Sequence, residues 1–162
     1  MRRPIPLIAP ALLLLLAGQA SAQGAALGFG QGGFDREAPI EVASDSLAVD
    51  QATGRAVLTG NVVVSQGDLR LSADEVVVGY AEVDGARRIE RLDAAGSVIV
   101  VSGPDAAEAQ EATYVLGSGT ITMLGDVVVT QDGNTLGGDS LAIDLETGAG
   151  TVTGRVRTTL RP

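Results

Sequence analysis

The sequence predicts an all-β protein whose short strands wind into an elongated two-sheet roll or sandwich. From Ile40 onward, apolar and polar residues alternate with a period of two, as expected for strands with one buried face. Turn residues such as Asp84-Gly85 and Asp132-Gly133-Asn134 separate these segments, so the strands are short. The nearest approach to a helix is the Ala- and Glu-rich stretch 104–112, whose only apolar residues are alanines.

Internal repeats extend this prediction from strands to architecture. Residues 45–50 (Asp-Ser-Leu-Ala-Val-Asp) recur as residues 139–144 (Asp-Ser-Leu-Ala-Ile-Asp), and residues 58–66 recur as residues 123–131. A unit this small cannot bury its own apolar face and must stack on its neighbours. We therefore expect one elongated structure whose function lies along its length.

The first residues have the pattern of a secretory signal peptide. Arg2 and Arg3 precede an apolar run over residues 5–17, and the small residues 20–22 offer a cleavage motif. The run is shorter than the roughly 20 residues that cross a bilayer. We expect residues 1–22 to be removed near Ala22/Gln23, whereas retention would give an anchored subunit.

A glycine-rich leader and a proline precede the first expected strand. Residues 23–37 are predicted to be flexible because of their glycines, although Phe29 and Phe34 could dock on the folded part. Pro39 lies just before the first strand, where a missing N–H is tolerated.

Recurring glycines and acidic residues mark the expected corners of the roll. A glycine within a strand pattern indicates a bulge or bend. An Asp before a strand can bond neighbouring backbone N–H groups and fix a corner, an interpretation we prefer to a ligand or catalytic role. Three of the four spacings between corner residue and glycine are 15 residues, and the other contains an insertion around residues 82–88. The pairs are Asp45 and Gly60, Asp74 and Gly96, Gln110 and Gly125, and Asp139 and Gly154.

The inward face is the candidate binding surface. Its apolar residues fit either a closed, filled core or an open groove that holds acyl chains. The scarcity of large aromatic residues slightly favours room in the interior. The residues assigned to this face are Leu47, Val49, Val62, Val64, Leu71, Val76, Val78, Val98, Val100, Val127, Val129, Leu141 and Ile143.

Composition argues against several other classes of function. The chain has no cysteine or histidine, which removes disulfides, Ser-His-Asp catalysis and histidine metal sites. Its net charge of −9 and lack of lysine make nucleic acid a poor partner. Residues 137–141 lack the inner glycine and the nine-residue period of a calcium-binding β-roll. We expect no metal, no cofactor and no enzymatic activity, and keep as the enzymatic alternative a carbohydrate-active β-helix using Asp74 and Asp139.

Two segments of the chain resemble a known family. Residues 40–47 contain its Ser-Asp start, and residues 58–76 contain Leu-Thr-Gly-Asn-Val-Val-Val-Ser-Gln-Gly followed by a Leu-Ser-Ala-Asp-Glu-Val return. This pattern closely resembles the OstA-like (LptA) domain family of periplasmic lipopolysaccharide transport. Tyr114 and residues 124–127 resemble the second half of the domain, and the resemblance covers about residues 38–154.

The resemblance implies a fold and a set of partners. It implies a single elongated, open antiparallel β-jellyroll over residues 38–158, with a tail at 159–162 and no catalytic site. Such domains stack head to tail by backbone pairing and shield lipid A acyl chains of lipopolysaccharide in a periplasmic bridge. The implied partners are an LptC-like inner-membrane subunit and an LptD-like outer-membrane translocon. Contacts to lipid phosphates would fall to arginines, with Arg36, Arg55, Arg70, Arg87, Arg88, Arg91 and Arg155 as candidates.

Two non-enzymatic alternatives stay open at this point. A structural or adhesive β-solenoid that acts by self-assembly alone would have the same repeats and acidic charge. An anchored LptC-like transport subunit would differ only in keeping its N-terminal apolar segment.

Overall fold

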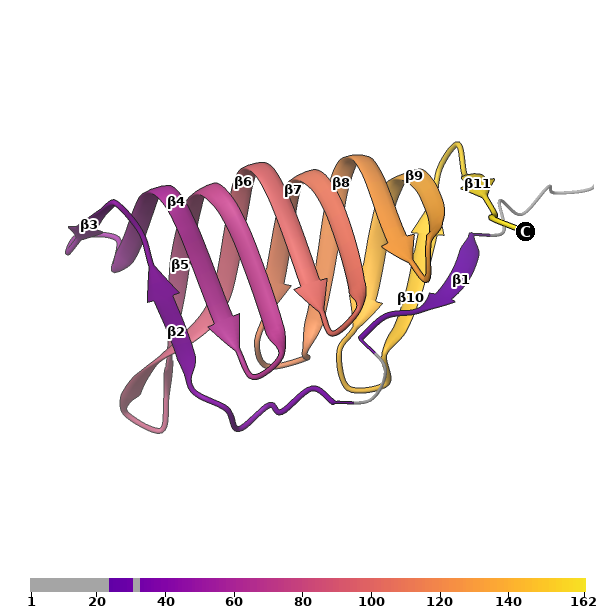
Figure 1. The fold of residues 1–162 in the computed structure, drawn as a ribbon. Helices are drawn as coiled ribbons and strands as arrows, with labels where there is room; N and C mark the ends of the chain where they lie inside the picture. The colour runs from indigo at the N-terminus through magenta and orange to yellow at the C-terminus, as the bar shows by residue number, and fades with distance from the viewer. Residues whose placement is uncertain (1–23, 31–32) are drawn as a thin grey trace, which may run out of the picture.

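A computed structural model describes residues 24–30 and 33–162, and the strands of these residues form one antiparallel sheet that is folded along its length (Figure 1). This confirms the predicted all-β fold and its open, elongated form. The predicted signal peptide, residues 1–22, lies outside the described residues. In the part of the chain that is described, no helix is long and apolar enough to cross a membrane.

The strands follow one another across the sheet almost in sequence order. The path is β1-β10-β9-β8-β7-β6-β5-β4-β2, with β3 also pairing β4 and β11 also pairing β9. The insertion predicted near residues 82–88 lies in the long β5–β6 hairpin. The strands are β1 (Ala25–Gly28), β2 (Ile40–Ala43), β3 (Ser46–Asp50), β4 (Arg55–Gln66), β5 (Leu69–Val83), β6 (Ala86–Ser102), β7 (Asp105–Val115), β8 (Thr120–Gln131), β9 (Asn134–Asp144), β10 (Ala149–Thr153) and β11 (Arg157–Thr159).

The sheet folds over at a row of corners, where the sequence predicted them. In β6 the corner is Gly96-Ser97, whose φ angles of +80° and +47° are both left-handed, and the register with β5 and with β7 shifts there. Left-handed φ is accessible to glycine at little cost, which explains the recurring residue. The same pair of positive φ angles recurs at Gly60-Asn61, Gly125-Asp126 and Gly154-Arg155.

Each corner glycine packs against the partner residue that the sequence spacing assigned to it. A Cβ built on Gly96 would lie 2.5 Å from Asp74 Oδ2, and one on Gly60 would lie 2.6 Å from Asp45 Oδ2. The hydrogen bonds differ from the prediction, however. The Asp45 carboxylate accepts from the Asn61 side chain at 2.9 Å, not from a backbone N–H. Its own N–H donates to the Gly60 carbonyl at 2.9 Å.

The corners divide the long strands into two facing layers. Layer A contains the whole of β1, β3 and β10. It also contains the halves of β4, β6 and β8 that precede a corner and the halves of β5, β7 and β9 that follow one. Layer B contains β2, β11 and the other halves. The hairpin turns of the two layers form two lips on the side away from the corners, and the space between these lips is the mouth of the roll.

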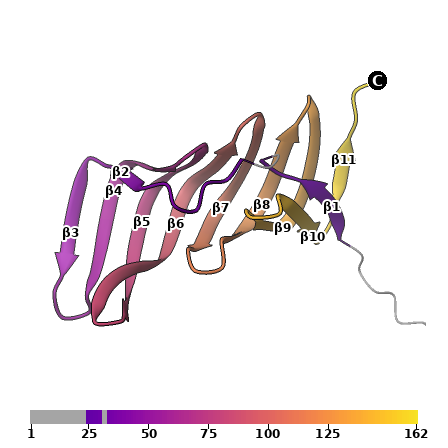
Figure 2. The same ribbon diagram turned by 90° about the horizontal axis from the view of Figure 1, so that it is seen from below.

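The described residues of the N-terminal leader, 24–30 and 33–37, lie against the sheet, contrary to the flexibility that the glycines predicted. Residues 25–28 form β1, which pairs with β10, and Phe29 is buried with 1% exposure. The described residues 33–39 then run along the side that carries the hairpin turns (Figure 1) and cross the strands when seen from below (Figure 2). The glycine content predicted flexibility wrongly here, because tertiary contacts outweigh the weak local preference of glycine for disorder.

Candidate functional site: the inner face and its mouth

The inner face consists of apolar rows that run along the roll from end to end. Cross-strand register aligns Leu47, Leu58, Val76, Ala94, Ala112, Met123, Leu141 and Val152 in one row of layer A. A second row of layer A aligns Val49, Ala56, Val78, Leu92, Tyr114, Ile121 and Ile143. A row of layer B aligns Val42, Val64, Leu71, Val100, Ala107, Val129 and Leu136. Directly paired side chains lie on one face of a sheet, so these rows are continuous apolar surfaces.

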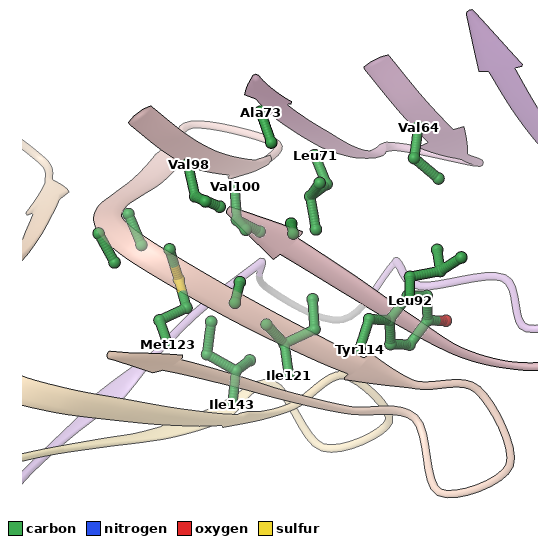
Figure 3. Packing of buried hydrophobic residues seen from close by; sticks show 14 of the residues in the cluster. Val64, Leu71, Ala73, Leu92, Val98, Val100, Tyr114, Ile121, Met123 and Ile143 are labelled. Atoms are coloured by element: carbon green, nitrogen blue, oxygen red, sulfur yellow. The ribbon is translucent and has the colours of Figure 1, made fainter. Parts of the chain in front are cut away.

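Most of the residues predicted to line a groove lie in a filled interior. Val62, Val76, Val98, Val100, Leu141 and Ile143 have 0% exposure. Figure 3 shows side chains of the two layers pointing toward one another, among them Leu71, Val100 and Ile121. Of the two interpretations, a closed, filled core or an open groove, this conformation therefore corresponds to the filled core. Their role in binding acyl chains stays a prediction.

Leu47 and Val49 are exceptions among the predicted groove residues. Each is 60% exposed, because β3 is an edge strand with no neighbour beyond it in the described chain. Their partners Leu58 and Ala56 are buried, so both belong to the inner face. The apolar rows thus reach the β2–β3 end of the roll uncovered.

Sequence reasoning missed several residues of this face. Alternation continues through Leu92, Ile121 and Met123, which are fully buried, so it could have identified them. The inward residues of β7 are difficult to identify from the sequence, because β7 is the Ala- and Glu-rich stretch. Its inward residues Ala107 and Ala112 give little hydrophobic signal. Phe29 was expected only as a residue that could dock on the folded part, and the structure buries it in the core.

Residues 28–30 close one part of the mouth by contacting both lips. Phe29 N–H donates to the Gly148 carbonyl at 2.6 Å, in the β9–β10 turn of layer A. Gly30 N–H donates to Asp105 Oδ2 at 2.8 Å, at the start of β7 in layer B. Gln131 Nε2, at the end of β8 in layer B, donates to the Gly28 carbonyl at 2.7 Å. The backbone of this segment therefore bridges the two layers.

Residues 34–38 close a second part of the mouth. Arg36 donates to the Gly117 carbonyl at 3.1 Å and pairs with Glu146 at 2.7 Å, both in turns of layer A. On the opposite lip, Gln66 Nε2 donates to the carbonyls of Arg36 and Ala38, each at 3.1 Å. Phe34 packs partly buried against the core. The interior is thus covered on its open side by the N-terminal residues.

A buried tyrosine connects this cover to the inner face. Tyr114 is 2% exposed, and its hydroxyl donates to Gln66 Oε1 at 2.8 Å. Gln66 in turn holds the carbonyls of residues 36 and 38. Burial raises the pKa of Tyr114 from 10.0 to about 12, and nearby Arg36 partly opposes this.

The burial of the Tyr114 hydroxyl predicts an alkaline loss of stability. The folded-state pKa of Tyr114 is above the unfolded one, so the contribution is complete below pH 10.0 and is lost as pH rises toward about 12. We expect the wild-type protein to lose up to about 2 kcal/mol of unfolding free energy across this window. Tyr114→Phe should remove that component and cost about 1–3 kcal/mol at neutral pH, because Gln66 Oε1 loses its donor.

The control for this prediction is Tyr80, which is 38% exposed. Urea unfolding at several pH values compares wild type, Tyr114→Phe and Tyr80→Phe. An alkaline loss that persists in Tyr114→Phe but disappears in Tyr80→Phe contradicts the assignment.

Several charged side chains of the described residues pair with one another. In the part of the chain that the structure describes, no group of three or more His, Cys, Asp or Glu residues could hold a metal ion. Three of the candidate phosphate-binding arginines are in ion pairs: Arg36 with Glu146, Arg91 with Asp93, and Arg155 with Asp139. The hydrogen bond from Arg155 lowers the pKa of Asp139.

Comparison with known proteins finds a family and several relatives. Residues 41–149 match a family model described as "LptA/(LptD N-terminal domain) LPS transport protein". An uncharacterized protein of Rhizobium meliloti is 30% identical over 138 residues, covering 80% of this chain and 74% of that protein. The lipopolysaccharide export system protein LptH of Pseudomonas aeruginosa is 30% identical over 138 residues, covering 79% of this chain and 77% of LptH. The lipopolysaccharide export system protein LptA of Escherichia coli is 26% identical over 113 residues, covering 66% of this chain and 60% of LptA.

A solved structure has the same fold. The crystal structure of LptH from Pseudomonas aeruginosa, described as the LptA homologous periplasmic component of the conserved lipopolysaccharide transport device, superposes with a TM-score of 0.71 and 23% identity. It covers 80% of this chain and 100% of that one. Because the family model matches most of the sheet, the chain belongs to the LptA/LptD N-terminal domain family of lipopolysaccharide-transport proteins.

Proposed function

We propose that this protein is a periplasmic component of lipopolysaccharide transport, exported by a cleaved signal peptide, and that its inner face shields the acyl chains of lipid A. The observation that carries the proposal is the set of apolar rows that continue from strand to strand along the roll. A surface of this shape suits a cargo that passes along the protein, since the rows are apolar at almost every position.

Energetics favour partial covering of the cargo over complete enclosure. Burying an acyl chain is worth about 0.8 kcal/mol per CH₂. Several fully buried chains would exceed the affinity ceiling of roughly 20 kcal/mol, and release would be too slow for transport. A roll with a mouth between two lips allows acyl chains to be only partly covered. The filled interior of the free protein must then open when lipid enters.

The ends of the roll support the proposed bridge. Among the described residues, no strand pairs with the outer edges of β2, β3 or β11, so backbone donors and acceptors are available for strand addition. Leu47 and Val49 bring the apolar rows to the β2–β3 end. We propose that copies stack head to tail, and that an LptC-like inner-membrane subunit and an LptD-like outer-membrane translocon pair with the terminal edges.

Site-specific photo-crosslinking tests the lipid-binding face. A photo-crosslinking amino acid at Leu47 or Val64, both on the inner face, is expected to capture lipopolysaccharide in cells. The matched controls are the neighbouring outward positions Ala48 and Val63, which should capture little because adjacent residues of a strand face opposite sides. Equal capture at inward and outward positions would contradict the proposed groove.

A purely structural self-assembling protein is the competing function. It would also stack through the free edges, but its stacking would not depend on lipid. Sedimentation equilibrium with and without lipopolysaccharide separates the two functions when it is combined with the crosslinking result. Concentration-dependent stacking without capture of lipid at any inward position would favour the structural protein.

A further inference from the structure

The two ends of the roll differ in the strand that forms their layer A edge. At one end, β2 is the edge of layer B and β3 is the edge of layer A, and both outer edges are free in the described chain. At the other end, β11 is the free edge of layer B. The layer A edge there, β10, is already paired along its length with β1 of the same chain, from Ala25 opposite Val152 to Gly28 opposite Ala149. The layer A edge at this end is therefore β1 in place of β10, and the outer side of β1 has no partner strand among the described residues.

The segment that occupies the β10 edge also closes the mouth. We call residues 25–30 the clasp: β1 together with Phe29 and Gly30. Phe29 lies in the core with 1% exposure and bonds to the β9–β10 turn. Gly30 bonds to Asp105 on the opposite lip. The clasp thus cannot leave β10 without also removing a buried side chain from the interior and a bridge between the lips.

The attachment of the clasp is weaker than that of the central strands. β1 has only four residues and lies at an edge, whereas β5 and β6 pair over most of their length. At the bridge, Asp105 is 1% exposed and its Oδ2 accepts from Gly30, whereas its Oδ1 has no hydrogen-bond partner among residues 24–30 and 33–162. An unsatisfied buried carboxylate oxygen favours a state in which water reaches it. Short edge elements of this kind occupy the low-stability end of a folded protein.

We propose that the clasp is released when a second copy of this chain docks, and that its release opens the interior to acyl chains. The β2 strand of the incoming copy first pairs with the free β11 edge. Its β3 strand then replaces β1 along β10. Phe29 leaves the core with β1, so docking and opening of the mouth become one event. Only the entry of acyl chains rests on the proposed transport function, whereas docking and release of the clasp do not.

Charge supports a second copy as the occupant. Arg157 lies on β11 and Glu41 lies on β2, the two strands that pair in layer B when a second copy docks in this way. A head-to-tail arrangement brings these opposite charges together, which favours correct encounter. The exposed Leu47 and Val49 of the incoming copy would then extend the inner rows of layer A where β1 had been.

A disulfide lock tests the inference on the full mature chain, which has no cysteine of its own. Ala26 and Thr151 are direct partners between β1 and β10, and both are exposed on the outer face. Their Cα separation, about 4.5–5.5 Å for paired residues, suits a disulfide. A26C/T151C therefore fixes the clasp when oxidised and frees it when reduced. The matched control is T122C/A142C, which joins the exposed partners of β8 and β9 and leaves the clasp untouched.

The first readout is amide hydrogen exchange without lipid. In the reduced protein we expect Phe29 and Gly30 to exchange at least about tenfold faster than the amides of β6, because the clasp opens locally. Oxidation of A26C/T151C should slow that exchange at least about tenfold, and oxidation of T122C/A142C should not. Exchange of Phe29 and Gly30 only at the rate of β6 would show that the clasp is part of the cooperative fold and would overturn the inference.

The second readout follows docking and lipid entry. Oxidised A26C/T151C should weaken head-to-tail association in sedimentation at least about tenfold, and should reduce capture of lipopolysaccharide by a photo-crosslinker at Val64. Gln131→Ala, which removes the bond to the Gly28 carbonyl, should act in the opposite direction. Equal association and equal capture in the oxidised and reduced forms would overturn the inference and leave the proposed function intact. Loss of lipopolysaccharide capture in both the oxidised and the reduced protein would contradict the proposed function. Hydrogen exchange and association would then still show whether the clasp is released on docking.

Discussion

Replacing Gly96 by alanine is expected to lower the free energy of unfolding by about 2–5 kcal/mol. The φ angle of +80° costs an L-residue about 1–2 kcal/mol. The new methyl group would also lie 2.5 Å from Asp74 Oδ2 and 2.9 Å from its Cβ, so the corner must shift. Urea unfolding followed by circular dichroism measures the loss.

Two other glycines separate these two costs. Gly103 has a φ of +58° but open space around its Cα, so Gly103→Ala should cost only about 1–2 kcal/mol from the backbone. Gly117 has no positive φ, and a Cβ added to it would have no atom within 4 Å, so Gly117→Ala should change stability by less than about 0.5 kcal/mol. Equal losses at Gly96 and Gly103 would show that packing against Asp74 contributes nothing to the corner.

Leu141→Ala is expected to destabilise the protein by about 2–5 kcal/mol, whereas Leu47→Ala should cost less than about 1 kcal/mol. The two leucines occupy the same position of the sequence repeat, each following an Asp-Ser pair. Leu141 has 0% exposure between β8 and β10, and Leu47 has 60% exposure on the edge strand β3. Thermal or urea unfolding of the two variants under the same conditions measures the difference.

The same pair of variants separates stability from association. If the exposed end of the inner face joins a neighbouring molecule, Leu47→Ala should weaken head-to-tail association and leave the monomer fold intact. Leu141→Ala should act through folding, and its association should recover where the variant is fully folded. A large loss of monomer stability in Leu47→Ala would contradict the exposed position of β3.

The local sequence was a good guide to faces and corners. Period-two alternation assigned Val62, Val98 and Leu141 to the inward side, because side-chain direction in a strand depends only on parity. Spacing identified the partners Asp74 and Gly96, because a positive φ and a close contact together leave few residue types possible. β7 shows the limit of this reasoning, since alanines at inward positions carry little hydrophobic signal.

The N-terminal residues were not open to the same reasoning. Five glycines in a short stretch predicted flexibility, and only the packed chain reveals that Phe29 fills the core and that β1 pairs with β10, far away in sequence. The pairing of Arg36 with Glu146 and of Gly30 with Asp105 joins residues more than 70 positions apart. No local pattern encodes such contacts, because they form only between residues that the folded chain brings together.

The sequence by itself determined that the chain is a cornered β roll with one apolar face, because both properties follow from the residue type at each position. The tertiary structure decided whether that face is open or closed. The same valines and leucines would line a groove or fill a core, depending on the distance between the two layers and on what covers the mouth. In this protein the side chains of the two layers pack on one another, and the N-terminal segment covers the mouth through contacts that need both lips in place.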